Sequence, residues 1–569
     1  MRWVLKEQKS HPWLNSCAEV LHLPKEVVNL ISQLSFADEK EFMSFFVPTL
    51  KDVEDPNKIQ NLVRAVECID AVCKANQKIA IVSDYDVDGI TSMALMKRCF
   101  DALGFTFCPF FPNRDTEGYG LTERLVDRIL SNASFDFLIA LDCGTNSIAA
   151  IEKLNVAGIQ VIVVDHHQHN CEKLPKAIVV NPHVDPHLHS KSSQNLCSVG
   201  LVFKWVHAWL KRLKSEKYEP ALEMRLRHFL DLVALGTVAD LVPLRDENRL
   251  WVYFGLREMV QTQLIGLKKL LEVSGCNLNF PLNVEDVSFK LAPRINVSGR
   301  LDSADMPYQL LISDDEALCQ QLAGTLNDLN GERQKIERNI VKEAEAMILA
   351  RPHRWAYVLY KEDWHVGVVG IVAGKLSRKF NCPVFVLGLH EGKAKGSGRS
   401  IPEVNLVEMF SGASSLIAQW GGHPAAVGLS IEINKIQAVE DFFNDYLKRI
   451  FPASLPEPTL NIAAVMRLEK LTSQFLNNMD RLAPFGQGNE MPVFVIENVI
   501  LGEDIERFGQ QGTHLRFKLN NFSVIGWGLG HSGISSGQAV DLAVCCGWSY
   551  WQTARSIQLQ LIDWHPHVS

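Results

Sequence analysis

Acidic residues that directly follow a short apolar segment give the first indication of chemistry in this sequence. Residues 83–89 read Ser-Asp-Tyr-Asp-Val-Asp-Gly, so Asp84, Asp86 and Asp88 place three carboxylates within five residues. Carboxylates this close repel one another, and such an array is most stable when cations neutralise it. A polar turn or a helix cap would explain the same residues without any ligand. Taken alone, the segment leaves both interpretations open.

Three further polar sites follow apolar stretches later in the chain. Asp142 begins the segment Asp-Cys-Gly-Thr-Asn, Asp165-His166-His167 follows four consecutive β-branched residues, and Asp240 closes the apolar stretch 232–239. A lone histidine pair or a single buried aspartate is usually structural. Together, however, several carboxylates and an imidazole at adjacent strand ends could hold two divalent cations, which activate water and stabilise in-line displacement at phosphorus. Mostly oxygen ligands with one histidine favour Mn²⁺ or Mg²⁺ over a thiolate-binding metal.

Hydrophobic patterning predicts the elements that must position these residues. Strands are predicted over 79–82, 135–141 and 161–164, and a helix over 91–103. Strands that alternate with helices imply a parallel sheet with helices on both faces. In such sheets, ligand-binding residues lie at the carboxyl ends of the strands, and the polar sites are expected to fall there.

The remainder of the chain divides into three kinds of pattern. Residues 1–75 are predicted to be helical, and an amphipathic pattern over 315–349 predicts one long connecting helix. Residues 355–451 mix short strands with helices. After the proline-containing segment 451–458 the chain is strand-like, which favours a small barrel. The predicted fold class is therefore α/β, with a parallel-sheet domain, a long helix, a smaller α/β domain and a C-terminal β-barrel.

Composition narrows the class of protein. A chain of 569 residues is long enough for about three or four domains. The net charge of −8 argues against a surface coated with basic residues, but clustered aspartates lower the total even where a basic groove exists. Charges in the first nine residues argue against a signal peptide, and there is no apolar run of about twenty residues to span a membrane. The 13 cysteines lack zinc-finger spacing, so reduced thiols and a cytoplasmic location are expected.

Several strings of residues resemble one known family. Asp165-His166-His167 matches the name-giving motif of the DHH phosphoesterases, and residues 84–89 resemble their first motif. Longer strings occur in the order found in RecJ nucleases, from about residue 46 onward. They are Glu-Gly-Tyr-Gly-Leu at 117–121, Pro-Arg-Ile-Asn-Val-Ser-Gly-Arg at 293–300, Trp-His-Val-Gly-Val-Val-Gly-Ile at 364–371, Gly-Ser-Gly-Arg-Ser at 396–400, Gly-Gly-His at 421–423 and Pro-Phe-Gly-Gln-Gly-Asn at 484–489.

The resemblance implies a single-stranded-DNA-specific 5′→3′ exonuclease of recombination and repair that releases 5′-mononucleotides. It implies two Mn²⁺ or Mg²⁺ ions, with Asp142 bridging them and His167 contacting the scissile phosphate. The implied metal ligands are Asp84, Asp86, Asp142, His166 and Asp240. Asp88 is either a further ligand or a supporting group. Related phosphoesterases have a histidine where this chain has Ala80, so one ion is expected to bind more loosely.

A second set of residues is implied to bind the substrate strand, which would thread between the first domain and a DHH-associated domain. Ser397 and Arg399, with Arg114, Arg294 or Arg300, resemble a pocket for a 5′-terminal phosphate, since guanidinium groups bind phosphate oxygens bidentately. Gly396 and Gly398 would let backbone amides approach the anion, although a flexible turn is the alternative. His365 and His423 are implied to line the active cleft, or else to make structural hydrogen bonds.

The expected domain organisation follows from the patterns and the resemblance together. It comprises an N-terminal helical segment at 1–75, a DHH catalytic domain at 76–312, a connecting helix at 313–350, a DHH-associated domain at 351–453 and an OB-fold single-strand-binding domain at 456–569. Departures from the RecJ pattern occur at 548–555, at Val297-Ser298 and at Val427, and they affect the expected substrate preference and not the chemistry. Single-strand-binding protein and a RecQ-like helicase are implied as partners.

Two other functions remain open at the level of sequence. One is a related phosphodiesterase that acts on short oligonucleotides, cyclic dinucleotides or pyrophosphate, although such enzymes generally lack the terminal barrel. The other is a non-catalytic DNA-binding scaffold. The complete set of aspartates and histidines argues against a scaffold, because mutually repelling carboxylates serve no purpose there.

Overall fold

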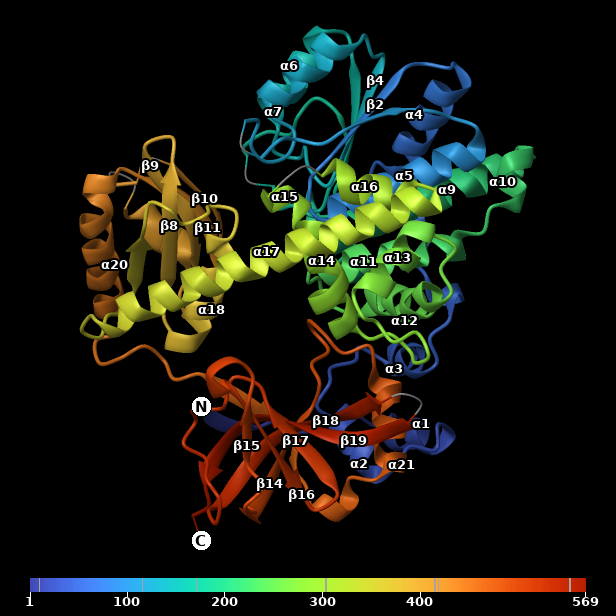
Figure 1. The fold of residues 1–569 in the computed structure, drawn as a ribbon. Helices are drawn as coiled ribbons and strands as arrows, with labels where there is room; N and C mark the ends of the chain where they lie inside the picture. Colours follow the sequence, from blue (N-terminus) through green and yellow to red (C-terminus); the bar gives the residue numbers. More distant parts are fainter. Residues whose placement is uncertain are drawn as a thin grey trace. The chain divides into compact units, whose positions relative to one another are not determined.

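The computed structural model describes residues 1–9, 11–114, 116–169, 171–301, 304–413, 416–417, 419–551 and 554–568, with only the backbone at 300, 301, 551 and 554 (Figure 1). The chain forms two compact units. Unit 1 consists mainly of Thr325–Leu460, and unit 2 consists mainly of Trp3–Gly299 and Asn461–Ser569. Among the described residues, no helix is long and apolar enough to cross a membrane. All 13 cysteines are free thiols.

A five-stranded parallel sheet in unit 2 carries the predicted acidic sites. Its strand order is β3-β2-β4-β5-β6, and every neighbouring pair is parallel. The strands are β2 (Ile79–Ser83), β3 (Cys108–Phe110), β4 (Phe137–Leu141), β5 (Gln160–Val164) and β6 (Ile178–Val180). The three strands predicted from the sequence are confirmed, with β4 beginning two residues later than predicted. Their nearly continuous apolar sequences reflect burial on both faces of the sheet.

Helices cover both faces of this sheet, as predicted. Helices α6 (Glu123–Asn132) and α7 (Ile148–Val156) pack on the face that carries Ala80, Leu138 and Val163. Helices α5 (Val87–Leu103) and α9 (Ser198–Ser215) lie on the opposite face (Figure 1). The predicted helix at 91–103 is confirmed and extends four residues further toward the acidic segment.

The apolar stretch before Asp240 is not a strand. Leu230–Ala239 form helix α11, and Asp240 is its C-terminal cap residue. The expectation that all four polar sites follow strands of the sheet is therefore wrong for Asp240. An all-apolar stretch of this length has no periodicity, so a buried helix and a buried strand look alike in sequence.

Further helices follow β6 in the sequence, and α12 and the π-helical segment among them contact α11. They are α8 (Lys191–Gln194), α10 (Glu219–Glu223), α12 (Asp246–Val260), α13 (Ile265–Val273), the π-helical segment Asp286–Leu291, α14 (Ala292–Asn296), α15 (Ser298–Leu301) and α16 (Asp305–Ile312). The predicted connecting helix is confirmed as α17 (Glu316–Leu349), a single helix of 34 residues. The boundary between the two units falls within it, after Gly324.

Unit 1 is a smaller α/β domain, as predicted. Its mixed sheet has the order β10-β11-β9-β8-β7, in which only β7 and β8 pair in parallel. The elements are β7 (Tyr357–Tyr360), α18 (Val369–Phe380), β8 (Val384–His390), β9 (Lys393–Arg399), α19 (Leu406–Ser411), β10 (Gln419–His423), β11 (Ala426–Ile431) and α20 (Ile436–Ile450). Helix α20 packs on one face of the sheet, and α18 with the C-terminal part of α17 packs on the other.

The C-terminal part of the chain is rich in strands, as predicted. A seven-stranded sheet has the order β13-β14-β18-β19-β17-β16-β15. The elements are β12 (Thr459–Ile462), β13 (Ala464–Val465), α21 (Ser473–Met479), β14 (Val493–Ile500), β15 (Glu506–Phe508), β16 (His514–Leu519), β17 (Phe522–Gly526), β18 (Ala539–Trp551) and β19 (Ala554–Pro566).

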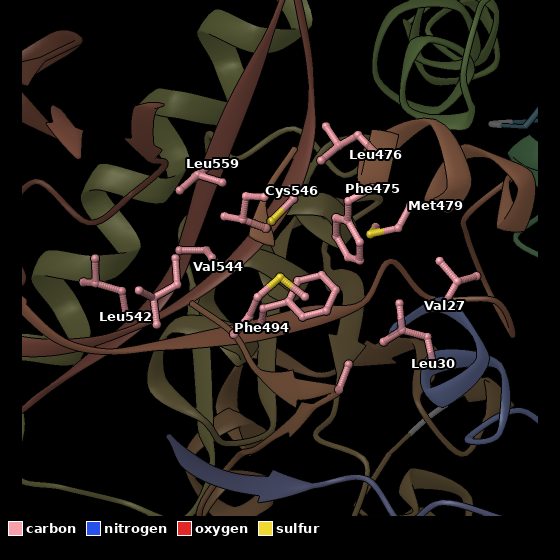
Figure 2. Close-up of a cluster of buried hydrophobic side chains, with 14 of the residues drawn as sticks. Val27, Leu30, Phe475, Leu476, Met479, Phe494, Leu542, Val544, Cys546 and Leu559 are labelled. Carbon is pink, nitrogen blue, oxygen red and sulfur yellow. The ribbon is translucent and has the colours of Figure 1, made fainter. Parts of the chain in front are cut away.

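The N-terminal residues complete the core of this C-terminal sheet. Strand β1 (Arg2–Leu5) precedes helices α1 (Leu14–Val20), α2 (Lys25–Ile31), α3 (Glu39–Phe46) and α4 (Leu62–Lys74). Figure 2 shows Val27 and Leu30 of α2 beside Phe475 and Met479 of α21 and Phe494 of β14, all within one hydrophobic cluster. Residues 14–46 of the predicted segment 1–75 therefore share a single hydrophobic core with the C-terminal domain, a long-range contact that no local pattern in the sequence indicates. Helix α4 instead contacts α9 and β6.

Candidate metal centre

The acidic segment turns sharply between β2 and α5. Asp84 follows the last residue of β2, and Asp86 caps α5 by accepting a 3.1 Å hydrogen bond from the Gly89 backbone N–H. Gly89 packs directly on Asp84, because a Cβ at residue 89 would lie 2.3 Å from the Asp84 carbonyl oxygen. This segment therefore does cap helix α5, as one interpretation of the sequence suggested. In addition, its side chains place three carboxylates at one end of the sheet.

Asp142 leaves β4 in an uncommon backbone conformation. Its φ is 59°, in the left-handed region that non-glycine residues rarely adopt and that recurs at functional sites. Its backbone N–H donates to the Val164 carbonyl of β5 at 2.9 Å. Its Oδ1 accepts a hydrogen bond from the Ser198 hydroxyl, also at 2.9 Å. The fold therefore fixes both the backbone and the carboxylate of this residue.

Asp165 organises the two histidines that follow it. Its Oδ1 accepts hydrogen bonds from the backbone N–H groups of His166 and His167 at 2.8 and 3.1 Å, and lies 2.7 Å from His167 Nδ1. Its Oδ2 accepts from the Thr145 N–H at 3.0 Å. Sequence reasoning quoted this aspartate in its motif and assigned it no role. In the structure it sets the orientation of the His167 ring.

The other nitrogen of His167 contacts a residue that sequence reasoning also left without a role. His167 Nε2 lies 3.1 Å from the Tyr119 hydroxyl, and the Tyr119 ring meets the Tyr85 ring edge-on. Tyr119 belongs to the family-specific string at 117–121, for which no chemical role was predicted. A phosphate that reaches His167 Nε2 must displace or share the contact with Tyr119.

His166 brings together residues from four separate elements. Its Nε2 lies 3.4 Å from Asp142 Oδ1, 3.7 Å from Asp88 Oδ2 and 3.7 Å from Asp240 Oδ2. Asp240 reaches this point from the end of α11, although no strand carries it. Every metal ligand predicted from the sequence therefore lies in or beside one cluster.

Within this cluster, three groups of side chains have ligand atoms close enough to share an ion, with all atoms of a group within 4.8 Å of one another. The groups are Asp84 with Asp86 and Asp142, Asp142 with His166 and His167, and Asp88 with His166 and Asp240. Asp142 belongs to two of the groups, as a bridging ligand would. Asp88 belongs to one, and both of its oxygens also accept hydrogen bonds from backbone N–H groups, so its role as a ligand or a supporting group stays a prediction.

Several carboxylate oxygens in the cluster are buried away from solvent. Both carboxylate oxygens of Asp84 and the Oδ2 of Asp142 are buried without a hydrogen-bond partner among the described residues. A buried oxygen without a partner costs free energy, and a carboxylate costs more than a neutral group. These oxygens and their hard-ligand chemistry fit a divalent cation such as Mn²⁺ or Mg²⁺.

The electrostatics of the cluster agree with a need for cations. Burial and the neighbouring carboxylates raise the pKa values of Asp84, Asp88, Asp142 and Asp240 above their usual range. Burial alone would lower the pKa of His167, but the hydrogen bond and charge of Asp165 raise it to about 9. The same contact holds the pKa of Asp165 well below its usual range, despite burial.

Position 80, where related enzymes have a histidine, lies within the sheet. Ala80 is fully buried in β2, between β3 and β4, and belongs to the hydrophobic cluster under α6 and α7. It adds no ligand to the centre. Looser binding of one ion remains a prediction.

The three arginines that were predicted to grip phosphate from the first domain differ in their surroundings. The Arg114 guanidinium lies 5.9 Å from the centre of the Tyr85 ring, one residue from Asp84. Arg294 donates to the Lys290 carbonyl at 2.7 Å from helix α14. The side chain of Arg300 lies outside the described residues. Arg114 therefore lies beside the acidic segment.

A basic group predicted to bind phosphate lies in unit 1. Arg399 Nη1 donates to the Ser397 hydroxyl and, at 2.9 Å, to the Gly398 carbonyl. Gly370, in the first turn of α18, packs against both side chains. A helix N-terminus carries partial positive charge, which favours an anion near these residues.

The two histidines predicted in unit 1 are both exposed. His365 lies in the turn before α18 and accepts a 3.1 Å hydrogen bond from the Gly367 N–H through Nδ1. This is the structural hydrogen bond considered as an alternative, and it leaves Nε2 outside the turn. His423 ends strand β10.

The glycines of residues 396–398 serve a different purpose from the one expected. Strand β9 pairs with β8 on one side and β11 on the other, so its backbone amides belong to the sheet and the segment is not a flexible turn. A Cβ at Gly396 would lie 2.1 Å from the Val386 carbonyl oxygen, and one at Gly398 would lie 2.2 Å from the Phe385 ring. These positions need glycine for close packing, so the prediction that they expose amides to an anion is wrong.

An aromatic cluster lies on the C-terminal sheet. Phe508 of β15, His514 of β16 and Trp527 after β17 have ring centres 5.0 to 5.6 Å apart. Trp527 is 56% exposed, and the Arg516 guanidinium lies 5.6 Å from the centre of the Phe508 ring. Phe508 and His514 are half-buried, and Arg516 is paired with Glu506 at 2.8 Å. An exposed aromatic ring such as Trp527 is typical of surfaces that stack nucleic-acid bases.

Three family models match successive parts of the chain. The DHH family N-terminal domain matches residues 78–237, the DHHA1 domain matches 354–449, and the RecJ OB domain matches 462–563. The order agrees with the catalytic, DHH-associated and OB domains expected from the sequence.

Similar proteins extend over nearly the whole chain. The single-stranded-DNA-specific exonuclease RecJ of Bacillus subtilis is 33% identical over 99% of this chain and 70% of that protein. The enzyme of the same name from Escherichia coli is 30% identical over 84% of each chain. The crystal structure of Thermus thermophilus RecJ with Mn²⁺ has a TM-score of 0.83 and 26% identity, over 100% of this chain and 80% of that one. A structure of the same protein with Mg²⁺ has a TM-score of 0.77.

Proposed function

The chain belongs to the RecJ family of single-stranded-DNA-specific exonucleases, and from this membership we propose how its own residues act. We propose that it hydrolyses single-stranded DNA from the 5′ end and releases 5′-mononucleotides, with two divalent cations in the cluster around Asp142. The observation that carries the proposal is the set of buried oxygens on Asp84 and Asp142 that have no hydrogen-bond partner in the described part of the chain, next to a histidine oriented by Asp165.

The proposed metal ligands are Asp84, Asp86, Asp142, His166 and Asp240, with Asp88 close enough to His166 to contribute. Mn²⁺ or Mg²⁺ held there would activate water and offset the charge that develops at phosphorus. Asp142 would serve both ions, since it belongs to two of the three groups.

His167 is the proposed contact to the scissile phosphate. Asp165 holds its ring through Nδ1 and raises its pKa to about 9, so the imidazolium form is favoured at neutral pH in the absence of cations. A protonated Nε2 can donate to a phosphate oxygen. Tyr119 occupies this nitrogen in the structure and would exchange with the substrate.

Recognition of the 5′ end is proposed for Arg399 and Ser397, with Arg114, Arg294 and Arg300 as further candidates. A terminal phosphomonoester carries nearly one more negative charge than an internal diester, so arginines can discriminate it. Arg399 has the strongest support because Ser397 and the first turn of α18 lie next to it. His365 and His423 are proposed to contact the strand.

The C-terminal domain is proposed to bind single-stranded DNA through the cluster of Phe508, His514 and Trp527. Base stacking on exposed rings tolerates any sequence. Deleting residues from 456 onward would not test this role, because helices α1 to α3 would lose the core that they share with the domain. Point substitutions on its surface are required instead.

A product assay tests the proposed reaction. Matched single strands labelled at the 5′ or the 3′ end, a duplex, an RNA dinucleotide and pyrophosphate are incubated with the protein and Mn²⁺. Release of labelled mononucleotide from the 5′-labelled single strand alone, before any shortening at the 3′ end, is expected. Faster cleavage of the dinucleotide or pyrophosphate would favour the alternative phosphodiesterase, and no cleavage would favour the scaffold. Single-strand-binding protein and a RecQ-like helicase remain predicted partners.

A further inference from the structure

One residue at the start of helix α9 contacts two carboxylates of the acidic cluster. The Ser198 hydroxyl donates a 2.9 Å hydrogen bond to Asp142 Oδ1, and its backbone N–H donates a 2.7 Å hydrogen bond to Asp88 Oδ2. The next N–H, that of Val199, donates to Asp88 Oδ1 at 2.8 Å. Ser198 therefore joins Asp142, a member of two candidate metal groups, to Asp88 of the third.

These contacts lie out of reach of solvent. Ser198 is fully buried, and Asp88 and Asp142 are each 1% exposed. Water does not compete for hydrogen bonds in such a place, so each bond restrains its carboxylate strongly. The first N–H groups of α9 also carry partial positive charge, which offsets the repulsion among the carboxylates.

The two oxygens of Asp142 are in different situations. Oδ1 accepts the hydrogen bond from Ser198, whereas Oδ2 is buried without a hydrogen-bond partner among the described residues. The positive φ of residue 142 sets where the side chain starts, and the bond to Ser198 sets the plane of its carboxylate. Oδ1 is therefore held in place by a hydrogen bond, and Oδ2 can bind a cation.

We propose that Ser198 is a positioning residue for metal binding. Its hydroxyl fixes the Asp142 carboxylate so that Oδ2 faces a divalent cation, and its backbone N–H holds Asp88 beside the same centre. This inference rests on the proposed function of Asp142 as a metal ligand. Groups that orient ligands in this way typically change metal affinity about 10- to 100-fold when removed.

The test measures Mn²⁺ binding to the full chain by titration calorimetry, together with thermal unfolding in EDTA. Ser198→Ala removes only the hydroxyl and keeps both backbone contacts to Asp88. Its affinity for Mn²⁺ is expected to fall at least about tenfold, with a corresponding rise in the Mn²⁺ concentration that gives half-maximal activity. Ser198→Thr keeps the hydroxyl and is expected to recover most of the affinity.

Ser92→Ala is the matched control. Ser92 is fully buried in α5 of the same domain, and its hydroxyl has no hydrogen-bond partner among the described residues. The control is expected to bind Mn²⁺ like the wild type. Ser198→Ala affinity within about twofold of the wild type, an equal loss in Ser92→Ala, or a Ser198→Ala protein that is unfolded in EDTA would each overturn the positioning role.

The same titration separates this inference from the metal centre itself. If the wild type binds no Mn²⁺, or Asp142→Ala binds it normally, the proposed centre fails. If Asp142→Ala loses binding while Ser198→Ala keeps it, only the role of Ser198 fails. Should Ser198→Thr be too large for the buried position, the comparison of Ser198→Ala with Ser92→Ala still decides the outcome.

Discussion

The acidic cluster of unit 2 and the basic group of unit 1 satisfy their charges in opposite ways. Asp84 and Asp142 keep buried oxygens without hydrogen-bond partners among the described residues, and their neighbours are further carboxylates. Arg399, in contrast, already donates to Ser397 and to the Gly398 carbonyl of its own strand. Among the described residues, the acidic cluster holds more carboxylates than the imidazolium of His167 can balance, whereas the basic group is satisfied without any ligand.

This difference predicts different consequences of ligand binding. A cation that enters the acidic cluster relieves repulsion and desolvation together, so binding should stabilise unit 2 strongly. A phosphate that reaches Arg399 must replace hydrogen bonds that already exist, so the net gain is smaller. Substitutions in the two regions should therefore differ in size and in kind.

The largest effect is expected for Asp142→Ala. Loss of a carboxylate that serves both ions should reduce the rate of cleavage about a thousandfold or more, which corresponds to roughly 4 kcal/mol. Initial rates on 5′-phosphorylated single strands measure this, with binding of the same strand as the control for folding. Retention of more than about a tenth of the wild-type rate would contradict a bridging role.

A smaller and more selective effect is expected for Arg399→Ala. The ratio of rates on 5′-phosphate and 5′-hydroxyl single strands should fall about 10- to 100-fold, since charged hydrogen bonds contribute roughly 1.5–3 kcal/mol. Lysine should restore only part of the preference, because a point charge cannot replace the guanidinium fork. Mn²⁺ affinity should not change.

Arg378→Ala is the control, since Arg378 is an exposed arginine on α18 in the same unit. An unchanged ratio in Arg399→Ala would leave Arg114, Arg294 and Arg300 to be tested next. An equal fall in Arg378→Ala would mean that general positive charge, and not a specific fork, reads the 5′ end.

Trp527→Ala tests a proposed contact that involves no charge, the stacking of a DNA base on the Trp527 ring. Removal of one stacking ring should weaken binding of single-stranded DNA about tenfold, within the roughly 1–3 kcal/mol per base typical of such contacts. Rates at saturating DNA and Mn²⁺ affinity should stay unchanged. Ile500→Ala, at a 74% exposed apolar side chain on β14, is the control. Equal DNA affinities for the two variants would argue against the aromatic cluster as a binding surface.

The smallest effect is expected for Asp84→Asn. The direction of its change in stability is informative, because it should reverse when Mn²⁺ is added. The raised pKa of Asp84 means that the ionised carboxylate destabilises the folded protein without cations, and increasingly so as the pH rises above the usual aspartate range. The free energy of unfolding of the asparagine variant should therefore exceed that of the wild type in EDTA at pH 8 by on the order of 1 kcal/mol. The variant should accordingly unfold at a higher temperature. With Mn²⁺ the order should reverse.

Differential scanning calorimetry of both proteins, with and without Mn²⁺, checks this reversal. Asp328→Asn on α17 replaces an exposed aspartate and should change neither measurement. A lower unfolding temperature for Asp84→Asn in EDTA would show that the carboxylate stabilises the fold by itself, and the contrast between the two regions would disappear.

The amino-acid sequence determines a large part of this protein through short-range patterns. Short apolar runs specify β2, β4 and β5, and an amphipathic repeat specifies α17 over its full length. The same runs end in Asp84, Asp142 and Asp165, so the carboxyl ends of parallel strands gather them without further information. Residue spacing is enough to predict this part of the site, because each strand is followed directly by its own polar residue.

Tertiary structure alone decided the remaining features, because they join residues that are distant in the chain. Asp240 reaches the acidic cluster from the end of a helix, and Ser198 contacts Asp142 across 56 residues of sequence. Gly396 owes its identity to the Val386 carbonyl on a neighbouring strand, and Val27 is buried against residues more than four hundred positions later. Neither hydrophobic period nor motif spacing carries such information, since the free energy of these contacts arises only when the folded chain brings both partners together.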